Sequence, residues 1–133
     1  MMLKKSKIVM LAMLSFMVIT PNIASARVSG VDLYIQNIKF DHNVEAGQLV
    51  DFAIYVKNRG RESTEVMGLT IDFGNGMGMG FGGTIVIKPG ETRVFNLGIV
   101  YQETGKFVIK ASVNTSGDVN LGNNAKTAII VVK

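Results

Sequence analysis

His42 is the only histidine of the chain, and a histidine is the side chain best suited to general-base chemistry near neutral pH. It lies in the turn-like run Asp41-His42-Asn43, and neighbours in a sequence rarely point at one another. A serine nucleophile needs a base within hydrogen-bond reach, and the chain has no cysteine to act as a thiol nucleophile. We therefore predict that His42 is a solvated loop residue and that no residue of the chain is catalytic.

The ten acidic residues give no second route to catalysis. Glycoside hydrolysis needs two carboxyl groups that face each other across the scissile bond. Here the acids are spread over turns and over strand positions that we expect to be exposed, and no two of them stand out as a pair. We predict that the protein is not an enzyme.

Residues 78–83 match the dinucleotide-binding pattern G-x-G-x-x-G and follow a predicted strand. That motif works only when a helix follows it, because the N-terminus of the helix holds the pyrophosphate. Residues 84–87 are Thr-Ile-Val-Ile, which indicates a strand, and Pro89-Gly90 comes next. The match is accidental, and we expect no cofactor.

A run of oxygen-bearing side chains before the last strand could in principle bind Ca²⁺, which takes oxygen ligands. A site with one carboxylate is weak, and asparagine favours turns for backbone reasons. We therefore predict a turn without a bound metal. The run comprises Asp118, Asn120, Asn123 and Asn124.

The most unusual segment is residues 74–83, in which six glycines interleave with Asn75, Met77, Met79 and Phe81. A hairpin turn needs one or two glycines, so we expect this segment to be a mobile loop. Its three large side chains could form an adaptable apolar contact surface, which would make Met77, Met79 and Phe81 the candidate partner-binding residues. Alternatively, they fold back and cap one end of the hydrophobic core, because exposed apolar groups gain by burial.

The first 26 residues have the organisation of a secretory signal peptide. Three lysines (Lys4, Lys5, Lys7) precede an uncharged stretch at residues 8–19, and Ala24-Ser25-Ala26 gives an Ala-x-Ala cleavage site. The apolar stretch is shorter than the roughly 20 residues that a membrane span requires. We predict cleavage after Ala26, a mature chain of residues 27–133, and no membrane span in the mature protein.

Removal of the leader changes the charge of the chain. The mature chain would keep 14 − 3 = 11 basic and 10 acidic residues, so its net charge would be +1. A nearly neutral domain lacks the basic surface that nucleic acid requires, so we expect no nucleic-acid partner. Without cysteine the domain must be stabilised by its core rather than by disulfides.

From Val31 onward the apolar residues alternate with polar ones, which is typical of strands that bury one face. Val50, Phe52, Ile54 and Val56 should face the core, together with Phe107, Ile109 and Val113 on a later strand. Residues 128–132 are apolar throughout and indicate a strand buried on both faces. We predict strands at 31–40, 48–58, 64–73, 83–88, 92–99, 106–114 and 126–132, which form an all-β, immunoglobulin-like sandwich of two antiparallel sheets.

Turn residues join the predicted strands. Asn58 and Gly60 suit a turn with positive φ, and Pro89-Gly90 suits a type II turn. Asn123 and Asn124 can hydrogen-bond to neighbouring backbone groups before the last strand. We expect structural roles for all of them.

An ordered set of short motifs extends over the domain. It consists of Val31-Asp32-Leu33, Val56-Lys57-Asn58-Arg59-Gly60, Ile87-Lys88-Pro89-Gly90-Glu91-Thr92, Gly105-Lys106-Phe107 and Asp118-x-Asn120-x-x-Asn123-Asn124. Over about residues 30–133 this set resembles the cell-adhesion-related domain found in bacteria (CARDB), an immunoglobulin-like β-sandwich of prokaryotic exported proteins. The last loop of that family is usually richer in acids, whereas Asp118 is the only one here.

The resemblance and the leader together imply an exported, non-enzymatic module for binding, adhesion or assembly, acting through strand edges, the 74–83 segment, or both. We expect it to be secreted, periplasmic or on the cell surface, with a protein or a surface polysaccharide as partner, or with self-association. The alternative is a small secreted carbohydrate-binding or carbohydrate-processing protein. Sugar sites usually present aromatic platforms, and only Tyr34, Tyr55 and Tyr101 could serve, since there is no tryptophan.

Overall fold

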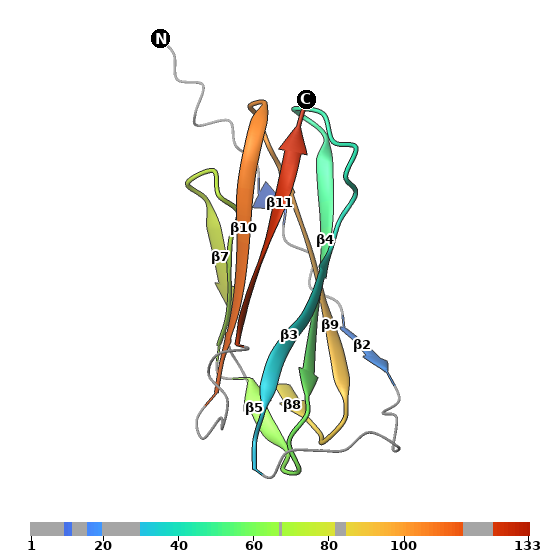
Figure 1. Ribbon diagram of the computed structural model, residues 1–133. Helices are drawn as coiled ribbons and strands as arrows, with labels where there is room; N and C mark the ends of the chain where they lie inside the picture. Colours follow the sequence, from blue (N-terminus) through green and yellow to red (C-terminus); the bar gives the residue numbers. More distant parts are fainter. Residues whose placement is uncertain (1–9, 12–15, 20–29, 67, 82–84, 116–123) are drawn as a thin grey trace.

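Two antiparallel sheets pack face to face in the computed structural model, which describes residues 10–11, 16–19, 30–66, 68–81, 85–115 and 124–133 (Figure 1). The first sheet contains β3 (Leu33–Lys39), β4 (Leu49–Asn58) and β9 (Thr92–Val100), and the short strands β1 (Met10–Leu11) and β2 (Phe16–Ile19) pair with β9. The second sheet has the order β11 (Ala125–Val132), β10 (Gly105–Asn114), β6 (Gly68–Asp72) and β7 (Gly78–Phe81). β5 (Thr64–Val66) and β8 (Ile85–Ile87) pair with each other and form a separate two-stranded ribbon.

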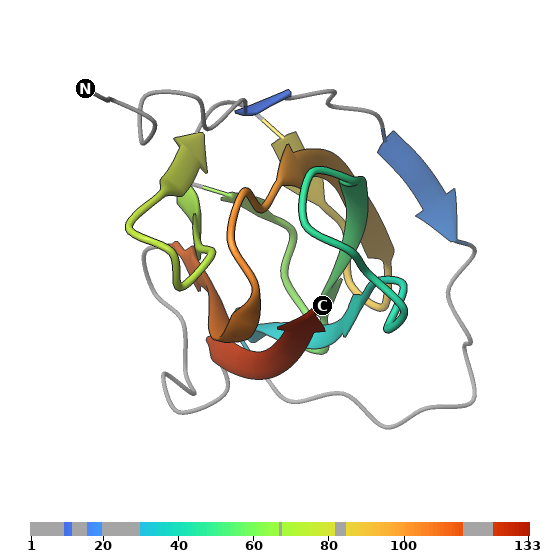
Figure 2. The ribbon, with the colours of Figure 1, turned by 90° about the horizontal axis from the view of Figure 1, so that it is seen from above.

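The described residues contain strands and no helix, which confirms the predicted all-β sandwich. Accordingly, no helix among them is long and apolar enough to cross a membrane. Seen from above, β3 (cyan) and β11 (red) lie side by side at one side of the sandwich, and β7 and β9 lie away from them (Figure 2).

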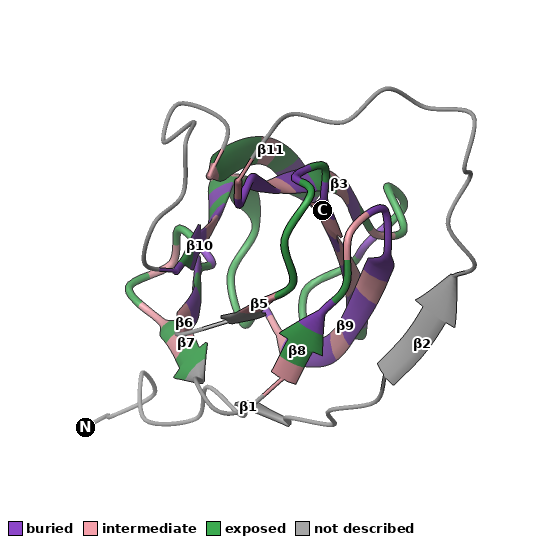
Figure 3. Ribbon diagram, turned by 90° about the horizontal axis from the view of Figure 1, so that it is seen from below, coloured by how far each residue is buried: buried purple, intermediate pink, exposed green. Residues whose placement is uncertain are grey.

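The core lies where the alternation of apolar residues placed it. Val50, Phe52, Ile54 and Val56 of β4 are at most 2% exposed, and the buried Ile109 and Val113 of β10 belong to the same core. Purple and other colours alternate along the strands in Figure 3, as expected when successive side chains point to opposite faces. Phe107 also packs against the core, but it lies near the start of β10 and is only partly buried. Its ring centroid is 4.9 Å from that of Tyr101.

Two of the predicted elements were wrong in detail. The single strand expected at 64–73 is two strands, because β5 pairs with β8 whereas β6 joins β10 and β7. The loop expected at 74–83 contains β7, which pairs antiparallel with β6. Glycine weakens strand formation, so the alternation of glycine with large residues was interpreted as a loop, although its period is that of a strand.

Asn58 has a role that the turn interpretation missed. Positive φ occurs only at glycines among the described residues, and neither Asn58 nor Gly60 has it. The fully buried Asn58 side chain instead donates from Nδ2 to the carbonyl oxygens of Glu62 (2.8 Å) and Ile87 (3.0 Å), and its Oδ1 accepts from the Gly60 amide (2.8 Å). It therefore ties β4 to the ribbon and to the following turn.

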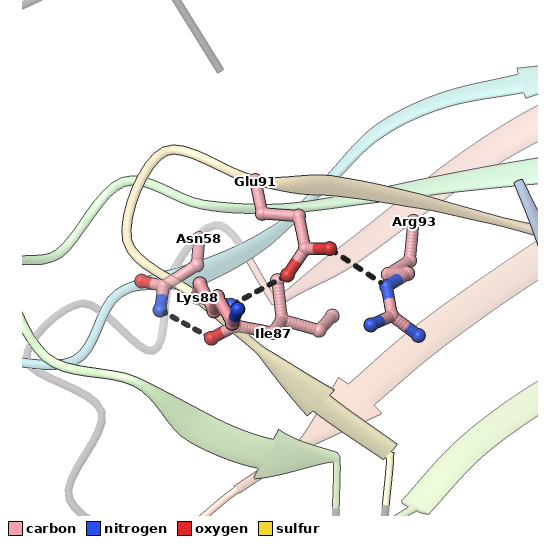
Figure 4. Close-up of polar contacts among 5 residues, drawn as sticks. All are labelled: Asn58, Ile87, Lys88, Glu91 and Arg93. Atoms are coloured by element: carbon pink, nitrogen blue, oxygen red, sulfur yellow. Dashed lines mark hydrogen bonds and ion pairs between the residues drawn. The ribbon is translucent and has the colours of Figure 1, made fainter. Parts of the chain in front are cut away.

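The neighbouring turn at Pro89-Gly90 is as predicted. Gly90 has φ +80°, and the Glu91 amide donates to the carbonyl of Lys88 over 2.9 Å, which is the geometry of a type II turn. The buried Glu91 carboxylate then accepts from the Lys88 amide (2.7 Å) and from Nε of Arg93 (3.0 Å), as Figure 4 shows. These contacts use both carboxylate oxygens to hold the turn against β9.

Gly60 is required for a steric reason rather than for its φ. A Cβ built there would lie 2.1 Å from the carbonyl oxygen of Gly30 and 2.8 Å from the amide nitrogen of Asp32, distances that no side chain can occupy. The same region is held by the ion pair between Nη2 of Arg59 and Oδ2 of the buried Asp32 (3.3 Å).

Candidate functional site

The β6–β7 hairpin holds the residues that the sequence singled out for partner binding. Met77 and Met79 are partly buried and pack against the hydrophobic core. Met79 pairs directly with Ile71, whose side chain is fully buried, so both side chains lie on the core-facing side of the sheet. The packing of the two methionines thus agrees with the core-capping alternative, although each keeps part of its side chain exposed.

Phe81 ends β7, where its backbone pairs with Leu69, and its side chain lies outside the described part of the structure. Along the same hairpin runs an open hollow of about 470 Å³. Three of its lining residues are glycines, which alternate with the two methionines. It is lined by Thr70, Ile71, Asp72, Gly76, Met77, Gly78, Met79 and Gly80.

The outer face of the β10–β11 hairpin carries an apolar patch that the sequence reasoning missed. Val108, Ile129 and Val131 are 54%, 58% and 39% exposed, and we call them the β10–β11 patch. Val108 pairs directly with Ile129, and Val131 pairs with Lys106, so the three side chains are neighbours on one face. Lys106 and Lys110, both exposed, flank Val108 along β10.

The patch also corrects the interpretation of the last strand. Residues 128–132 were expected to be buried on both faces, but only the side chains of Ile130 and Val132 are buried, and Ile129 and Val131 point outward. A continuous apolar run cannot by itself distinguish a buried strand from one that exposes apolar residues. The signal that could have found the patch is Val108, an apolar residue between Lys106 and Lys110 at positions predicted to face solvent.

His42 lies on the surface, as expected, with its ring centroid 4.7 Å from that of Phe40. The described ranges contain no group of three or more His, Cys, Asp or Glu side chains that could hold a metal ion. Of the oxygen-bearing run, Asp118, Asn120 and Asn123 lie outside the described residues. Asn124 accepts a hydrogen bond from the Val113 amide through its main-chain oxygen (2.8 Å), so it holds the start of β11 against β10.

Tyr101 is the titratable group with the most altered environment. Its ring is fully buried, and its hydroxyl donates to the carbonyl of Phe73 over 2.9 Å. Burial, and secondarily the negative charge of Asp72, raise the pKa of the Tyr101 hydroxyl well above its usual range. Because this hydroxyl stays neutral and is used to hold the β6–β7 turn, Tyr101 is a structural residue.

The other two tyrosines also have partners. The Arg59 guanidinium lies 4.6 Å from the ring centroid of Tyr34, and Nζ of Lys39 lies 4.8 Å from that of Tyr55. Both contacts are cation–π interactions, which are favourable but small at exposed positions. None of the three tyrosines therefore presents an unobstructed platform for a sugar ring.

Comparison with solved structures places the fold. The crystal structure of a CARDB domain from Pyrococcus furiosus, in complex with di-metal ions, is 21% identical, with a TM-score of 0.72, covering 86% of this chain and 99% of that one. The solution structure of the same domain is 25% identical, with a TM-score of 0.68, covering 79% and 97%. The sporulation control protein Spo0M of Bacillus subtilis is 13% identical, with a TM-score of 0.53, covering 78% and 49%.

No family model matches the chain, and no curated protein matches it in sequence. The fold is nevertheless defined: the chain is an immunoglobulin-like β-sandwich without cysteine, and CARDB domains are its structural neighbours. The resemblance that the short motifs indicated is thereby confirmed.

Proposed function

We propose that this protein is an exported, non-enzymatic binding module whose contact surface is the β10–β11 patch. The observation that carries the proposal is the exposure of Val108, Ile129 and Val131 side by side on one sheet face. Burying such a group against a partner stabilises the complex by about 25 cal/mol for each Å² of apolar surface removed from water. Contiguous exposed apolar residues within a polar rim are typical of interaction sites.

The rim indicates the chemistry of the partner. Lys106 and Lys110 extend from the same face as Val108, and Lys110 is opposite Asp72 of β6 in the sheet. A protein surface with an apolar centre and acidic residues around it would complement this arrangement. The state of the three tyrosines favours such a protein over a surface polysaccharide, because a sugar site would use exposed rings.

The location of the protein follows from its leader. A basic start, an apolar stretch and Ala24-Ser25-Ala26 support export and cleavage after Ala26. N-terminal sequencing of the exported protein should then begin at Arg27. An intact Met1 or Met2 on exported material would show that the leader is retained.

Site-specific photocrosslinking in cells tests the contact surface. A photoreactive amino acid at position 129 should give one discrete adduct with a protein, and Val108→Lys in the same chain should abolish it. The matched control position is Leu49, which is 43% exposed on the other sheet and should give no such adduct. An equal yield from positions 49 and 129, or no adduct at 129, would overturn the proposal.

A further inference from the structure

The outer edge of β9 differs from every other described sheet edge because short, separate segments of the chain pair with it. On one side β9 pairs with β4 over its whole length, from Leu49↔Val100 to Lys57↔Thr92. On the other side β2 is opposite Thr92–Phe95 in the register Phe16↔Phe95 to Ile19↔Thr92, and β1 is opposite Gly98 and Ile99. Figures 1 and 2 show β2 alongside β9.

The backbone groups that point towards this edge can be assigned. The carbonyl oxygens of Tyr101 and Glu91 accept from the amides of Gly47 and Asn58, so both face the β4 side. Backbone direction alternates along a strand, so the even-numbered residues of β9 turn their amides and carbonyls to the opposite side. Val94 and Gly98 therefore direct their N–H groups to the edge at which β2 and β1 pair.

The chemistry of this edge suits an apolar strand. Residues 94–100 contain no charge and no proline, the features that usually protect an edge from pairing with other chains. The segments that pair there, Met10–Leu11 and Phe16–Ile19, are apolar throughout. Val94 lies directly opposite Tyr55 of β4, so its side chain is on the outer face of the sheet, and yet it is only 1% exposed. On the other side of β9, its partner in the strand register is Met17 of β2.

We infer that the edge of β9 is a strand-acceptor site that takes an apolar, extended strand of a partner protein, antiparallel to Thr92–Ile99. The inference rests on the exported state in the proposed function, because cleavage after Ala26 removes β1 and β2 from β9. The site then keeps the geometry that accepts an apolar segment, while the outward N–H groups of Val94 and Gly98 lose their strand partners. Main-chain hydrogen bonds supply affinity in this mode of recognition, and alternate side chains supply selectivity.

The protein of residues 27–133 is suitable for the test, because it contains the whole of the hydrophobic core described above, from Val31 to Val132. The probe is a synthetic peptide with the sequence of residues 8–20 and a soluble lysine tail. We expect saturable binding that slows amide hydrogen exchange at Val94 and Gly98, with no change at Val108 or Ile129. A peptide with proline in place of Met17 is the control, and it should bind at least about tenfold more weakly, since one strand hydrogen bond is lost.

Two variants at one position separate pairing from side-chain contact. Val94→Pro removes the outward N–H without removing a hydrogen bond to β4, whereas Val94→Ala keeps the N–H. We expect Val94→Pro to weaken peptide binding at least about tenfold and Val94→Ala to weaken it much less. Should Val94→Pro fail to fold, the exchange pattern of the unsubstituted protein still decides the question.

Three results would overturn the inference: unchanged exchange at Val94 and Gly98, protection at β7 instead, or a dimer of the mature protein in which these amides are already protected by a second copy. A failure of the photocrosslinking at position 129 leaves the peptide experiment unaffected. Retention of Met1 on exported protein would refute cleavage and, with it, the unoccupied β9 edge, but it would leave the photocrosslinking at position 129 unaffected. The inference and the proposed function therefore fail in distinguishable ways.

Discussion

Substitution of Asn58 tests the structural reasoning most sharply, because two explanations of this residue predict different outcomes. A left-handed turn would tolerate Asn58→Gly, since glycine adopts positive φ at low cost. A buried amide that makes three hydrogen bonds would not tolerate it, because Glu62 and Ile87 would lose a donor and Gly60 would lose an acceptor.

The magnitude follows from those contacts. Each hydrogen bond contributes about 0.5–1.5 kcal/mol, and a buried polar group left unpaired costs about 1–3 kcal/mol. We therefore expect both Asn58→Ala and Asn58→Gly to lower the free energy of unfolding by about 3–5 kcal/mol. That is a large part of the 5–15 kcal/mol by which an ordinary domain is stable.

Equilibrium urea denaturation of the protein of residues 27–133 measures this loss. The control is Asp41→Ala, which removes the exposed hydrogen bond that the Asn43 amide donates to Oδ1 of Asp41 (2.9 Å) and should cost less than about 0.5 kcal/mol. A free energy of unfolding for Asn58→Gly within about 1 kcal/mol of the unsubstituted protein would refute the buried-amide explanation.

Three further predictions concern other parts of the sandwich. Phe107→Ala should lower the free energy of unfolding by about 2–3 kcal/mol, which is less than the loss at a fully buried phenylalanine. Lys106→Ala, on the opposite face, should lower it by less than about 0.5 kcal/mol, and equal losses in a denaturant titration would mean that the register of β10 is shifted. The raised pKa of Tyr101 means that the folded state keeps the hydroxyl proton when the unfolded state loses it, so stability should fall as the pH rises above about 10. Tyr101→Phe should remove this fall of the melting temperature with rising pH. An unchanged fall would assign it to another group. Met79→Ala should lower the free energy of unfolding by about 1–2 kcal/mol while leaving photocrosslinking at position 129 intact; a lost adduct without a change in the melting temperature would make Met79 a contact residue instead.

The sequence was most informative where one physical effect dominates. Alternation along residues 50–56 is produced by burial of one strand face, and it placed Val50, Phe52, Ile54 and Val56 correctly. The turn at Pro89-Gly90 was likewise predictable, because proline presets one torsion angle and glycine permits the next.

It was least informative where the outcome depends on tertiary contacts. Asn58 was assigned to a turn because asparagine favours turns, whereas its side chain is used by carbonyl groups up to 29 residues away. Ile129 and Val131 were assigned to the core because they are apolar, and only the register with β10 shows that they face outward. The hydrogen bond of Tyr101 to Phe73 gave no sequence signal, since its partner is a backbone oxygen 28 residues away.

The pairing of β4 with β9 has a consequence for how fast the chain folds. Its partners are separated by 100 − 49 = 51 residues at one end and by 92 − 57 = 35 at the other, so the central pairing of the first sheet closes long loops. Folding slows as contacts become more distant in sequence, because the chain loses entropy in closing each loop before the contact stabilises it. For a chain with a predicted export leader, slow folding lengthens the time during which the newly made polypeptide stays extended enough to be threaded through a narrow translocation channel.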